Sequence, residues 1–323
     1  MSLSYEFSVG SVRAREKNLL SSSDIEQLVS FNEINDLVRY LNDKGYGEGK
    51  TVDEILKSRS DSVWDYLKSV APDFSIFYPF IIVNDAHNFK VILKGIMSGR
   101  KREELLLSPS TIDTGVLIKA IEHKRFDILP EWMKKSAEEA YEIITHKTDA
   151  RECDAVIDKA TMEEMLRLSK NLESEFAVKY FNTIVFYSNI KIALRCSKTK
   201  ADADFLKKSL CEVDEFRMSS VISATLKGED ALVDELSKYS EYECGKAVEC
   251  YKTSPSLFEK YVDDLLMKSA VESCKRASEG CEPLVGYFLG VEAEKKVIHI
   301  IESGIKTDTD KEIIRERLRE IYG

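Results

Sequence analysis

The segment Gly45-Tyr46-Gly47-Glu48-Gly49-Lys50-Thr51 is the part of the sequence that most resembles a phosphate-binding loop. Its last three residues match the end of the pattern G-x-x-x-x-G-K-[ST], in which backbone amides and a helix N-terminus surround phosphates. Lys44 stands where the pattern requires its first glycine, and Thr51 pairs with Glu54 as a helix cap. We therefore favour a glycine-rich turn between two helices. A nucleotide-dependent enzyme that uses this loop is the second alternative.

Other residue types that carry chemistry are present without the spacing that chemistry requires. The sequence contains four histidines and seven cysteines, but no C-x-x-C, no H-E-x-x-H and no G-x-S-x-G pattern. Adjacent carboxylates such as Glu103 and Glu104 point in different directions on a helix and are typical of a solvated face. The sequence therefore predicts no catalytic residue, no metal ligand and no cofactor.

Comparison of the chain with itself reveals three similar segments. They are Asn88-Phe89-Lys90-Val91-Ile92-Leu93-Lys94, Asn189-Ile190-Lys191-Ile192-Ala193-Leu194-Arg195 and Val297-Ile298-His299-Ile300-Ile301-Glu302-Ser303. The equivalent residues Lys90, Lys191 and His299 are spaced by 101 and 108 positions. Repeats of that length account for nearly the whole chain.

The similarity between the first and third segments extends beyond them, because Asp85 aligns with Glu294 and Gly95 with Gly304. The polar positions of this signature are Asp85, Asn88, Lys90, Asn189, Lys191, Glu294 and His299. The repeat predicts three related helical bundles, at residues 1–108, 109–212 and 213–323, placed around a pseudo-threefold axis or in a row. Such polar positions either order their own bundle through hydrogen bonds or meet a partner.

Basic residues follow each of the three segments. They are Arg100, Lys101 and Arg102 after the first, Lys198 and Lys200 after the second, and Lys306 and Lys311 after the third. One interpretation is a docking face for an acidic protein surface. The other is that these cations offset the macrodipole at helix C-termini.

The elements that must position these residues read as helices throughout. Apolar residues recur at helical intervals, as in Val52, Ile55, Leu56, Val63 and Leu67, and sustained period-two alternation is missing. Six Ser or Thr residues also precede a Glu by three positions, as in a capping box: Ser23, Ser30, Thr51, Thr161, Ser256 and Thr309. Only 6 Pro and 14 Gly interrupt these patterns. We expect an all-α protein.

Charge and hydropathy limit the partners and the location of the chain. A formal net charge of -10, from 57 acidic and 47 basic side chains, disfavours binding to nucleic acid. The most apolar stretch, residues 76–83, is far shorter than the roughly 20 residues needed to span a bilayer, so we expect no direct bilayer insertion. The charged residues 1–20 do not read as a signal peptide, and an odd number of cysteines favours reduced thiols. A cytoplasmic protein is expected.

Several longer segments carry a resemblance to a known family. They include residues 78–95, which begin Tyr-Pro-Phe-Ile-Ile-Val-Asn-Asp, residues 282–289, residues 292–294 and the C-terminal residues 312–322. Together with the Tyr46-Gly47 turn and the length of the chain, they resemble the C subunit of bacterial and archaeal V/A-type ATPases, whose family includes the d subunit of the eukaryotic vacuolar ATPase. The resemblance covers essentially the whole chain.

The resemblance implies three related helical domains that form a funnel with no active site of its own. It also implies a rotor adaptor. Such an adaptor receives the central shaft, made of D- and F-type subunits, in its mouth, rests on the membrane proteolipid ring, and transmits torque for proton or sodium transport. It would be peripheral to the membrane on the cytoplasmic side.

The third repeat departs most from the signature, since Val297 and His299 replace the Asn and Lys of the other copies. This departure weakens any contact proposed for all three copies alike. The first alternative function is a free-standing helical scaffold that binds other proteins, although its repeats would normally be shorter and more regular.

Overall fold

The computed structural model describes residues 4–100 and 102–323, and every regular element in those two ranges is a helix. The all-α prediction is therefore confirmed. The α-helices are α1 (Tyr5–Glu16), α2 (Ser22–Ser30), α3 (Ile34–Asp43), α4 (Val52–Val70), α5 (Tyr78–Ser98), α6 (Thr114–Glu122), α7 (Glu131–Glu142), α8 (Ala150–Lys170), α9 (Glu175–Thr199), α10 (Ala203–Ser209), α11 (Met218–Lys227), α12 (Glu229–Leu236), α13 (Cys244–Thr253), α14 (Pro255–Cys274), α15 (Glu282–Lys306) and α16 (Lys311–Arg317). Short 3-10 helices are η1 (Phe74–Phe77), η2 (Glu103–Leu105), η3 (Phe126–Ile128) and η5 (Ser240–Tyr242), and η4 (Ile143–Lys147) is a π-helical turn.

The chain folds into two compact units. Unit 1 contains the residues up to Phe74 and those from Lys246 to Gly323, and unit 2 contains Ser75–Gly245. Unit 1 therefore brings the two ends of the sequence together. The ranges 1–108, 109–212 and 213–323 are defined by sequence similarity rather than by packing, and that threefold division stays a prediction.

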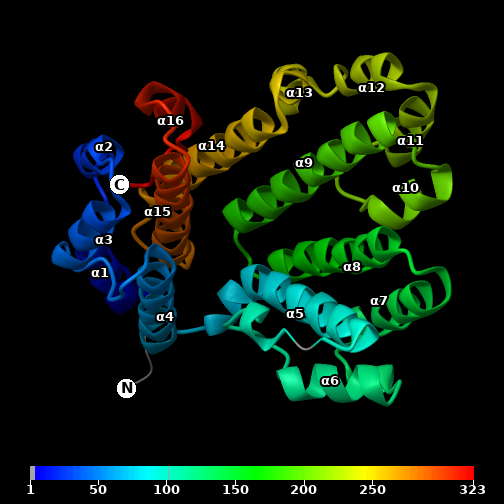
Figure 1. Cartoon of the computed structure of the whole chain (residues 1–323), viewed down its shortest axis with the longest axis horizontal. Coiled ribbons are helices and arrows are strands. Elements are labelled where there is room, and N and C mark those ends of the chain that lie inside the picture. Colours follow the sequence, from blue (N-terminus) through cyan, green and yellow to red (C-terminus); the bar gives the residue numbers. More distant parts are fainter. Residues whose placement is uncertain (1–3, 101) are drawn as a thin grey trace. The chain divides into compact units, whose positions relative to one another are not determined.

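Helix α15 forms the centre of unit 1. It contacts α1, α2, α3, α4, α14 and α16, which surround it in Figure 1. The first half of α15, from Pro283 to Val291, is buried on all sides, whereas His299 and Lys306 in its second half lie on an exposed polar face. Val297, Ile298 and Ile301 of α15 join residues of α2, α3 and α4 in one hydrophobic core. The apolar stripe predicted from Val52 to Leu67 is buried on α4, as its spacing indicated.

Helix α8 has the corresponding role in unit 2. It lies between α5 and α9 and also contacts α7 and α10. Figure 1 shows α5 and α9 running in the same direction and α8 running in the opposite one, so the C-terminal ends of α5 and α9 lie on the same side of this unit. The core between α5, α6, α7 and α8 contains aliphatic side chains such as Leu93 and Ile157 and aromatic ones such as Phe89.

Three glycines of α15 allow other segments to approach its backbone. A Cβ atom on Gly286 would lie 2.4 Å from the hydroxyl oxygen of Tyr322, and one on Gly290 would lie 2.9 Å from the Cβ of Tyr322. A Cβ on Gly304 would lie 2.4 Å from Ile314 of α16. The C-terminal segment therefore packs directly on α15, with the Tyr322 side chain fully buried.

The capping patterns located helix starts less well than they indicated helix content. Thr51 caps α4 as predicted, because its side chain accepts a hydrogen bond from the backbone amide of Glu54. Three other helices begin one or two residues away from the predicted caps Ser23, Ser256 and Thr309, since the N-cap residues of α2, α14 and α16 are Ser21, Ser254 and Asp310. The N-cap residue of α3 is Glu33, three residues after the predicted Ser30. The helix start predicted at Thr161 is wrong. It lies within α8, where its hydroxyl donates to the carbonyl of Ile157.

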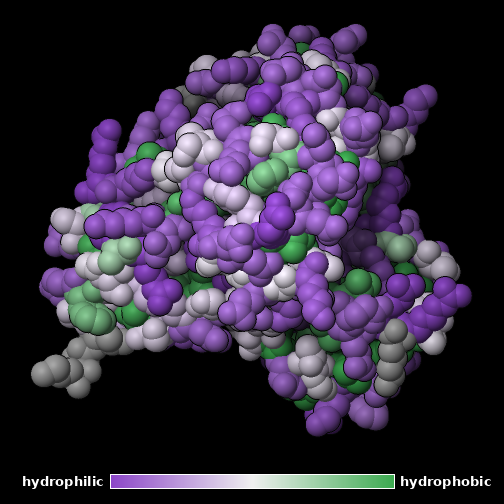
Figure 2. Space-filling view, turned by 60° about the vertical axis from the view of Figure 1, so that its left-hand side comes forward, coloured by the Kyte–Doolittle hydropathy of each residue, from purple (hydrophilic) through white to green (hydrophobic). Residues whose placement is uncertain are grey.

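The exposed side chains are mostly hydrophilic on the face that Figure 2 shows, where hydrophobic ones are scattered singly. Among the helices that the structure describes, none combines the length and the hydrophobicity needed to cross a membrane. Isolated exposed apolar residues such as Phe7 and Leu226 are ordinary for a protein surface.

Candidate functional site

The first signature helix, α5, binds the irregular segment that follows it through the side chain of Asn88. Asn88 Nδ2 donates to the carbonyl oxygen of Leu107 at 2.9 Å, and the Leu107 amide donates to Asn88 Oδ1 at 2.7 Å. Both halves of the side-chain amide are therefore satisfied, although Asn88 is fully buried. This paired contact fixes one residue of the chain beyond α5 against the middle of the helix.

Neighbouring residues of α5 extend the same contact along the segment. Asp85 is fully buried, and its carboxylate accepts hydrogen bonds from the Thr111 amide at 2.8 Å, from the Thr111 hydroxyl and from the Ile112 amide at 3.1 Å. Burial raises the pKa of Asp85, and these three hydrogen bonds oppose the shift by stabilising the charged form. The Asp85 carboxylate therefore has a structural role in ordering the segment.

Two further α5 residues that the sequence analysis did not single out take part. Asn84 Nδ2 donates to the Pro109 carbonyl at 2.8 Å, and His87 Nε2 lies 2.9 Å from the Leu105 carbonyl oxygen. They were missed because neither aligns with a matching residue in the other two copies of the repeat. The available signal was their position within one helical turn before Asn88 on the same helix.

The second signature helix, α9, repeats the asparagine contact. Asn189 Nδ2 donates to the Cys211 carbonyl at 2.7 Å, and the Cys211 amide donates to Asn189 Oδ1 at 3.0 Å. Asn189 is also fully buried. Phe186 stands at the position equivalent to Asp85, so this copy keeps the asparagine without the carboxylate.

The third signature helix, α15, keeps the carboxylate without the asparagine. Val297 is fully buried in the core of unit 1, and Glu294 is buried beside it with one oxygen accepting the Leu20 amide. The other oxygen of Glu294, the Tyr46 hydroxyl and two nitrogens of Arg59 are buried without a hydrogen-bond partner among the described residues. The Arg59 guanidinium lies 4.8 Å from the centre of the Tyr46 ring.

Burial is the main cause of the altered acidity in this cluster. It raises the pKa of Glu294 to about 7, although the Leu20 amide and the nearby Arg59 charge both favour the carboxylate. Burial and the negative charge of Glu294 also raise the pKa of Tyr46 well above its usual value. Glu294 is therefore the acidic signature residue whose charge is most sensitive to conditions near neutral pH.

The basic signature residues have three different environments. Lys90 Nζ lies 2.5 Å from a carboxylate oxygen of Asp158, and Lys94 Nζ lies 2.6 Å from Asp154, so both lysines pair with α8. Lys191 lies exposed on α9. His299 lies exposed on α15, with its Nδ1 3.5 Å from a carboxylate oxygen of Glu302.

The basic residues that follow the signature helices are mostly exposed. Arg100, Arg102, Lys198 and Lys200 belong to unit 2, at the ends of α5 and α9, and Lys101 lies outside the described residues. In unit 1, Lys306 pairs with Glu302 at 2.7 Å. Lys311 is half-buried and donates to the Phe31 carbonyl, which is a contact within the fold. A docking role for these residues stays a prediction.

The glycine-rich segment joins α3 to α4, which confirms the predicted turn between helices. The amides of Glu48, Gly49 and Lys50 donate to Ser58 Oγ, Asn42 Oδ1 and Glu54 Oε2 at 3.2, 3.3 and 2.7 Å. A Cβ on Gly47 or Gly49 would lie only 2.4 Å or 2.6 Å from atoms of the first turn of α4. The glycines therefore allow close packing, and these amides already donate to side chains of the chain itself.

Comparisons with known proteins agree with this architecture over almost the whole chain. A family model described as ATP synthase (C/AC39) subunit matches residues 8–317. The C subunit of the V-type sodium ATPase of Enterococcus hirae is 21% identical over 96% of this chain and 97% of its own length. The C subunit of the A-type ATP synthase of Methanobrevibacter smithii is 25% identical over 90% of this chain and 81% of its own length. The C subunit of the V-type ATP synthase of Thermus thermophilus is 25% identical over 70% of this chain and 72% of its own length.

Proposed function

The chain belongs to the ATP synthase (C/AC39) subunit family, the C subunits of V- and A-type ATPases, and from this premise we propose that it is a rotor adaptor. The family is non-catalytic. In this role the chain links the central shaft, made of D- and F-type subunits, to the membrane proteolipid ring. It passes on the torque that couples ATP to proton or sodium transport, on the cytoplasmic side of the membrane.

The observation that carries this proposal is the family match across both compact units, from residue 8 to residue 317. A match confined to one unit would be compatible with a shared module in an unrelated protein. The relatives from Enterococcus hirae and Methanobrevibacter smithii, which match nearly the whole chain, are each described as the C subunit of a V- or A-type complex.

The internal contacts of unit 2 suit a part that must carry load without deforming. The paired hydrogen bonds of Asn88 and Asn189 fix the segments that follow α5 and α9. The Asn189 contact with Cys211 is buried, where a polar group left unpaired is costly, and the Asn88 contact with Leu107 is partly buried. Ion pairs from Lys90 and Lys94 to α8 add contacts between neighbouring helices, although exposed pairs of this kind contribute little individually.

We also propose that the fold consists of three related bundles, at residues 1–108, 109–212 and 213–323, arranged as a funnel around a pseudo-threefold axis. The equivalent hydrogen bonds of Asn88 and Asn189 support a common origin for the first two. The burial of Glu294 on α15, at the position of Asp85 on α5, supports including the third.

Co-sedimentation of the purified chain tests the adaptor proposal. It is mixed with a shaft-containing soluble ATPase sector, with the detergent-solubilised proteolipid ring, and with both together. We expect binding to each partner alone and a complex in which one copy bridges them. Binding to neither partner, at low or near-physiological salt, would contradict the proposal and favour the free-standing scaffold.

A nucleotide-binding assay tests the second alternative. We expect no ATP affinity at the glycine-rich segment, because the amides of Glu48, Gly49 and Lys50 already donate to Ser58, Asn42 and Glu54. Replacement of Lys50 by Ala should then change nothing. An ATP-dependent activity that is lost in Lys50→Ala would support the enzyme instead.

A further inference from the structure

Three residues that the sequence patterns did not connect meet on the surface of unit 1. Asp53 lies in the first turn of α4, and His299 and Glu302 lie one turn apart on α15. The side-chain ligand atoms of all three residues lie within 4.8 Å of one another. The cluster combines one imidazole with two carboxylates, which is a donor set that divalent transition metals accept.

The distances within the cluster suit a tetrahedral metal ion after small side-chain rotations. Two ligands that are each about 2.0–2.1 Å from a tetrahedral ion lie roughly 3.3 Å apart. His299 Nδ1 and Glu302 Oε2 are already 3.5 Å apart. Asp53 and His299 are exposed, so their side chains are free to close the remaining distance.

The two oxygens of Glu302 are directed to different partners. Oε1 lies 2.7 Å from the ammonium of Lys306, and Oε2 faces His299. Glu302 is 7% exposed, so the ion pair holds its carboxylate in a fixed orientation. Lys306 would thus orient the Glu302 carboxylate through Oε1 while Oε2 binds the metal ion, and its positive charge limits the affinity of the site for a cation.

Comparison with the first signature helix shows what distinguishes this position. Lys90, the residue equivalent to His299, places its ammonium 2.5 Å from Asp158 and forms an ion pair. At the third position, the His299 imidazole stands beside two carboxylates. Asp53 forms no hydrogen bond or close ion pair with any residue that the structure describes, but its charge acts on the Lys306 ammonium, which pairs with Glu302. The Asp53 carboxylate is therefore not held by a direct contact, and the His299 imidazole can bind a metal ion where the Lys90 ammonium cannot.

We propose that Asp53, His299 and Glu302 form a binding site for a divalent transition metal of the Zn²⁺ type, with water completing the coordination. A site that contains imidazole favours Zn²⁺, Co²⁺ or Ni²⁺ over Mg²⁺ and Ca²⁺, which prefer oxygen ligands alone. The bound ion links the start of α4 to the last turns of α15. It stabilises the packing of unit 1 and is independent of the adaptor function.

The test is a titration of the full-length chain, stripped of metal with a chelator, with ZnCl₂ in a calorimeter and with CoCl₂ in a spectrophotometer. We expect one Zn²⁺ per chain, visible Co²⁺ absorption typical of four ligands, and a higher melting temperature with Zn²⁺. His299→Ala and Asp53→Asn should each weaken Zn²⁺ binding at least about tenfold. Both residues are exposed, so the variants should fold.

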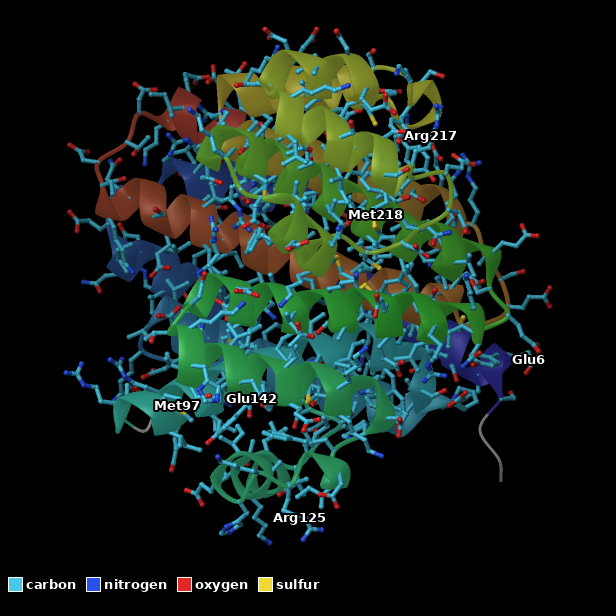
Figure 3. All side chains as sticks on the ribbon, turned by 90° about the vertical axis from the view of Figure 1, so that its right-hand side faces the viewer. Glu6, Met97, Arg125, Glu142, Arg217 and Met218 are labelled. Carbon is cyan, nitrogen blue, oxygen red and sulfur yellow. The ribbon has the colours of Figure 1, made fainter. Side chains whose placement is uncertain are left out.

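His146→Ala is the matched control. His146 is exposed on η4, and its Nε2 lies 2.9 Å from a carboxylate oxygen of Glu142, which is labelled in Figure 3. This is also a His–Glu pair, but among the described residues no third possible metal ligand lies beside it. The control should retain the single Zn²⁺ site. His299→Lys, which restores the lysine of the other repeats, should abolish binding while keeping the fold. Three results would overturn the proposal. They are Zn²⁺ binding that survives in His299→Ala, an equal loss of binding in His146→Ala, and binding that requires millimolar Zn²⁺.

Discussion

Asn88 and Asn189 occupy equivalent positions on two signature helices, and each exchanges two hydrogen bonds with one backbone residue beyond its own helix. The partner is Leu107 in the first case and Cys211 in the second. An asparagine side chain carries one donor and one acceptor group, so it can replace the two bonds of a backbone pair. The asparagine therefore joins its helix to an irregular segment and satisfies the backbone amide and carbonyl of one residue there.

Replacing either asparagine should destabilise the fold more than its size suggests. In Asn189→Ala, the amide and carbonyl of the buried Cys211 lose their partner, which costs roughly 1–3 kcal/mol of unfolding free energy. The loss should be smaller in Asn88→Ala, because Leu107 is exposed and its hydrogen bonds to Asn88 are only partly buried. Urea denaturation of the purified variants measures this loss. Asn18→Ala, in the exposed turn after α1, is the control and should change stability by less than about 0.5 kcal/mol. Equal effects at Asn18 and Asn189 would show that the paired contact contributes nothing.

The glycines of α15 provide a second prediction, because alanine normally favours a helix over glycine. A Cβ on Gly286 would lie 2.4 Å from the Tyr322 hydroxyl and 2.5 Å from the Cys274 Cβ. Gly286→Ala should therefore lower the unfolding free energy by roughly 1–3 kcal/mol, as overpacking does in other cores. Thermal and urea unfolding both measure the change.

Gly10 supplies the control for this substitution. It lies within α1, and a Cβ added there would meet no atom within 4 Å, so Gly10→Ala gains helix propensity without a clash. We expect Gly10→Ala to raise the unfolding free energy by roughly 0.5–1 kcal/mol. The two glycine substitutions should thus have opposite signs. A stabilising Gly286→Ala would mean that the C-terminal segment does not pack on α15.

The sequence predicted helix content well because apolar spacing and burial depend on the same periodicity. The stripe from Val52 to Leu67 lies on the buried face of α4 for this reason. Capping motifs were less informative, since a Ser or Thr followed by Glu also occurs within a helix. Thr161 illustrates the error, because its hydroxyl bonds to the Ile157 carbonyl inside α8 instead of starting a helix.

The contacts of the candidate site depend on pairs that local periodicity does not encode. The repeat pointed to Asn88 and Asn189, but the partners Leu107 and Cys211 lie in irregular segments whose paths follow from tertiary packing. The group formed by Asp53 and His299 joins distant parts of the sequence through the contact of α4 with α15. No spacing rule for metal ligands finds such a pair.

Glu294 should make the stability of unit 1 depend on pH. Its pKa rises from 4.5 to about 7 on folding, so between these values the native state binds more protons than the unfolded state. The stabilisation is complete below about pH 4.5 and is lost as the pH rises to about 7. A shift of this size corresponds to about 3 kcal/mol. Unfolding free energy measured by urea denaturation at intervals from pH 5 to pH 8 should show this fall.

Glu294→Gln separates this group from the other titrating residues. The charged or titratable neighbours of Glu294 are Arg59 on α4, Tyr46 before α4 and Asp24 on α2. A glutamine keeps an acceptor for the Leu20 amide and does not ionise, so the fall between pH 5 and 7 should largely disappear. Glu316→Gln, at an exposed position of α16, should keep the pH profile of the wild type. A Glu294→Gln profile parallel to the wild type would contradict the assignment.

The basic residues after α5 and α9 are better candidates for docking than those after α15. Arg100 and Lys200 are exposed on the side of unit 2 where both helices end. Lys311, by contrast, donates to the Phe31 carbonyl, so its substitution would disturb the fold of unit 1 as well as any partner contact.

Charge reversal at Arg100→Glu and Arg102→Glu should therefore weaken assembly with an acidic partner surface on the shaft or ring. We expect at least a roughly tenfold loss of affinity at low salt, and a smaller difference as the ionic strength approaches about 0.5 M, because salt screens exposed charges. The control is Lys57→Glu with Lys170→Glu, at exposed sites on α4 and α8, which changes the net charge equally. Co-sedimentation at several salt concentrations measures the affinities. Equal loss in both double variants would indicate a general charge effect, and normal assembly of the Arg100 and Arg102 variant would exclude a docking role for these two residues.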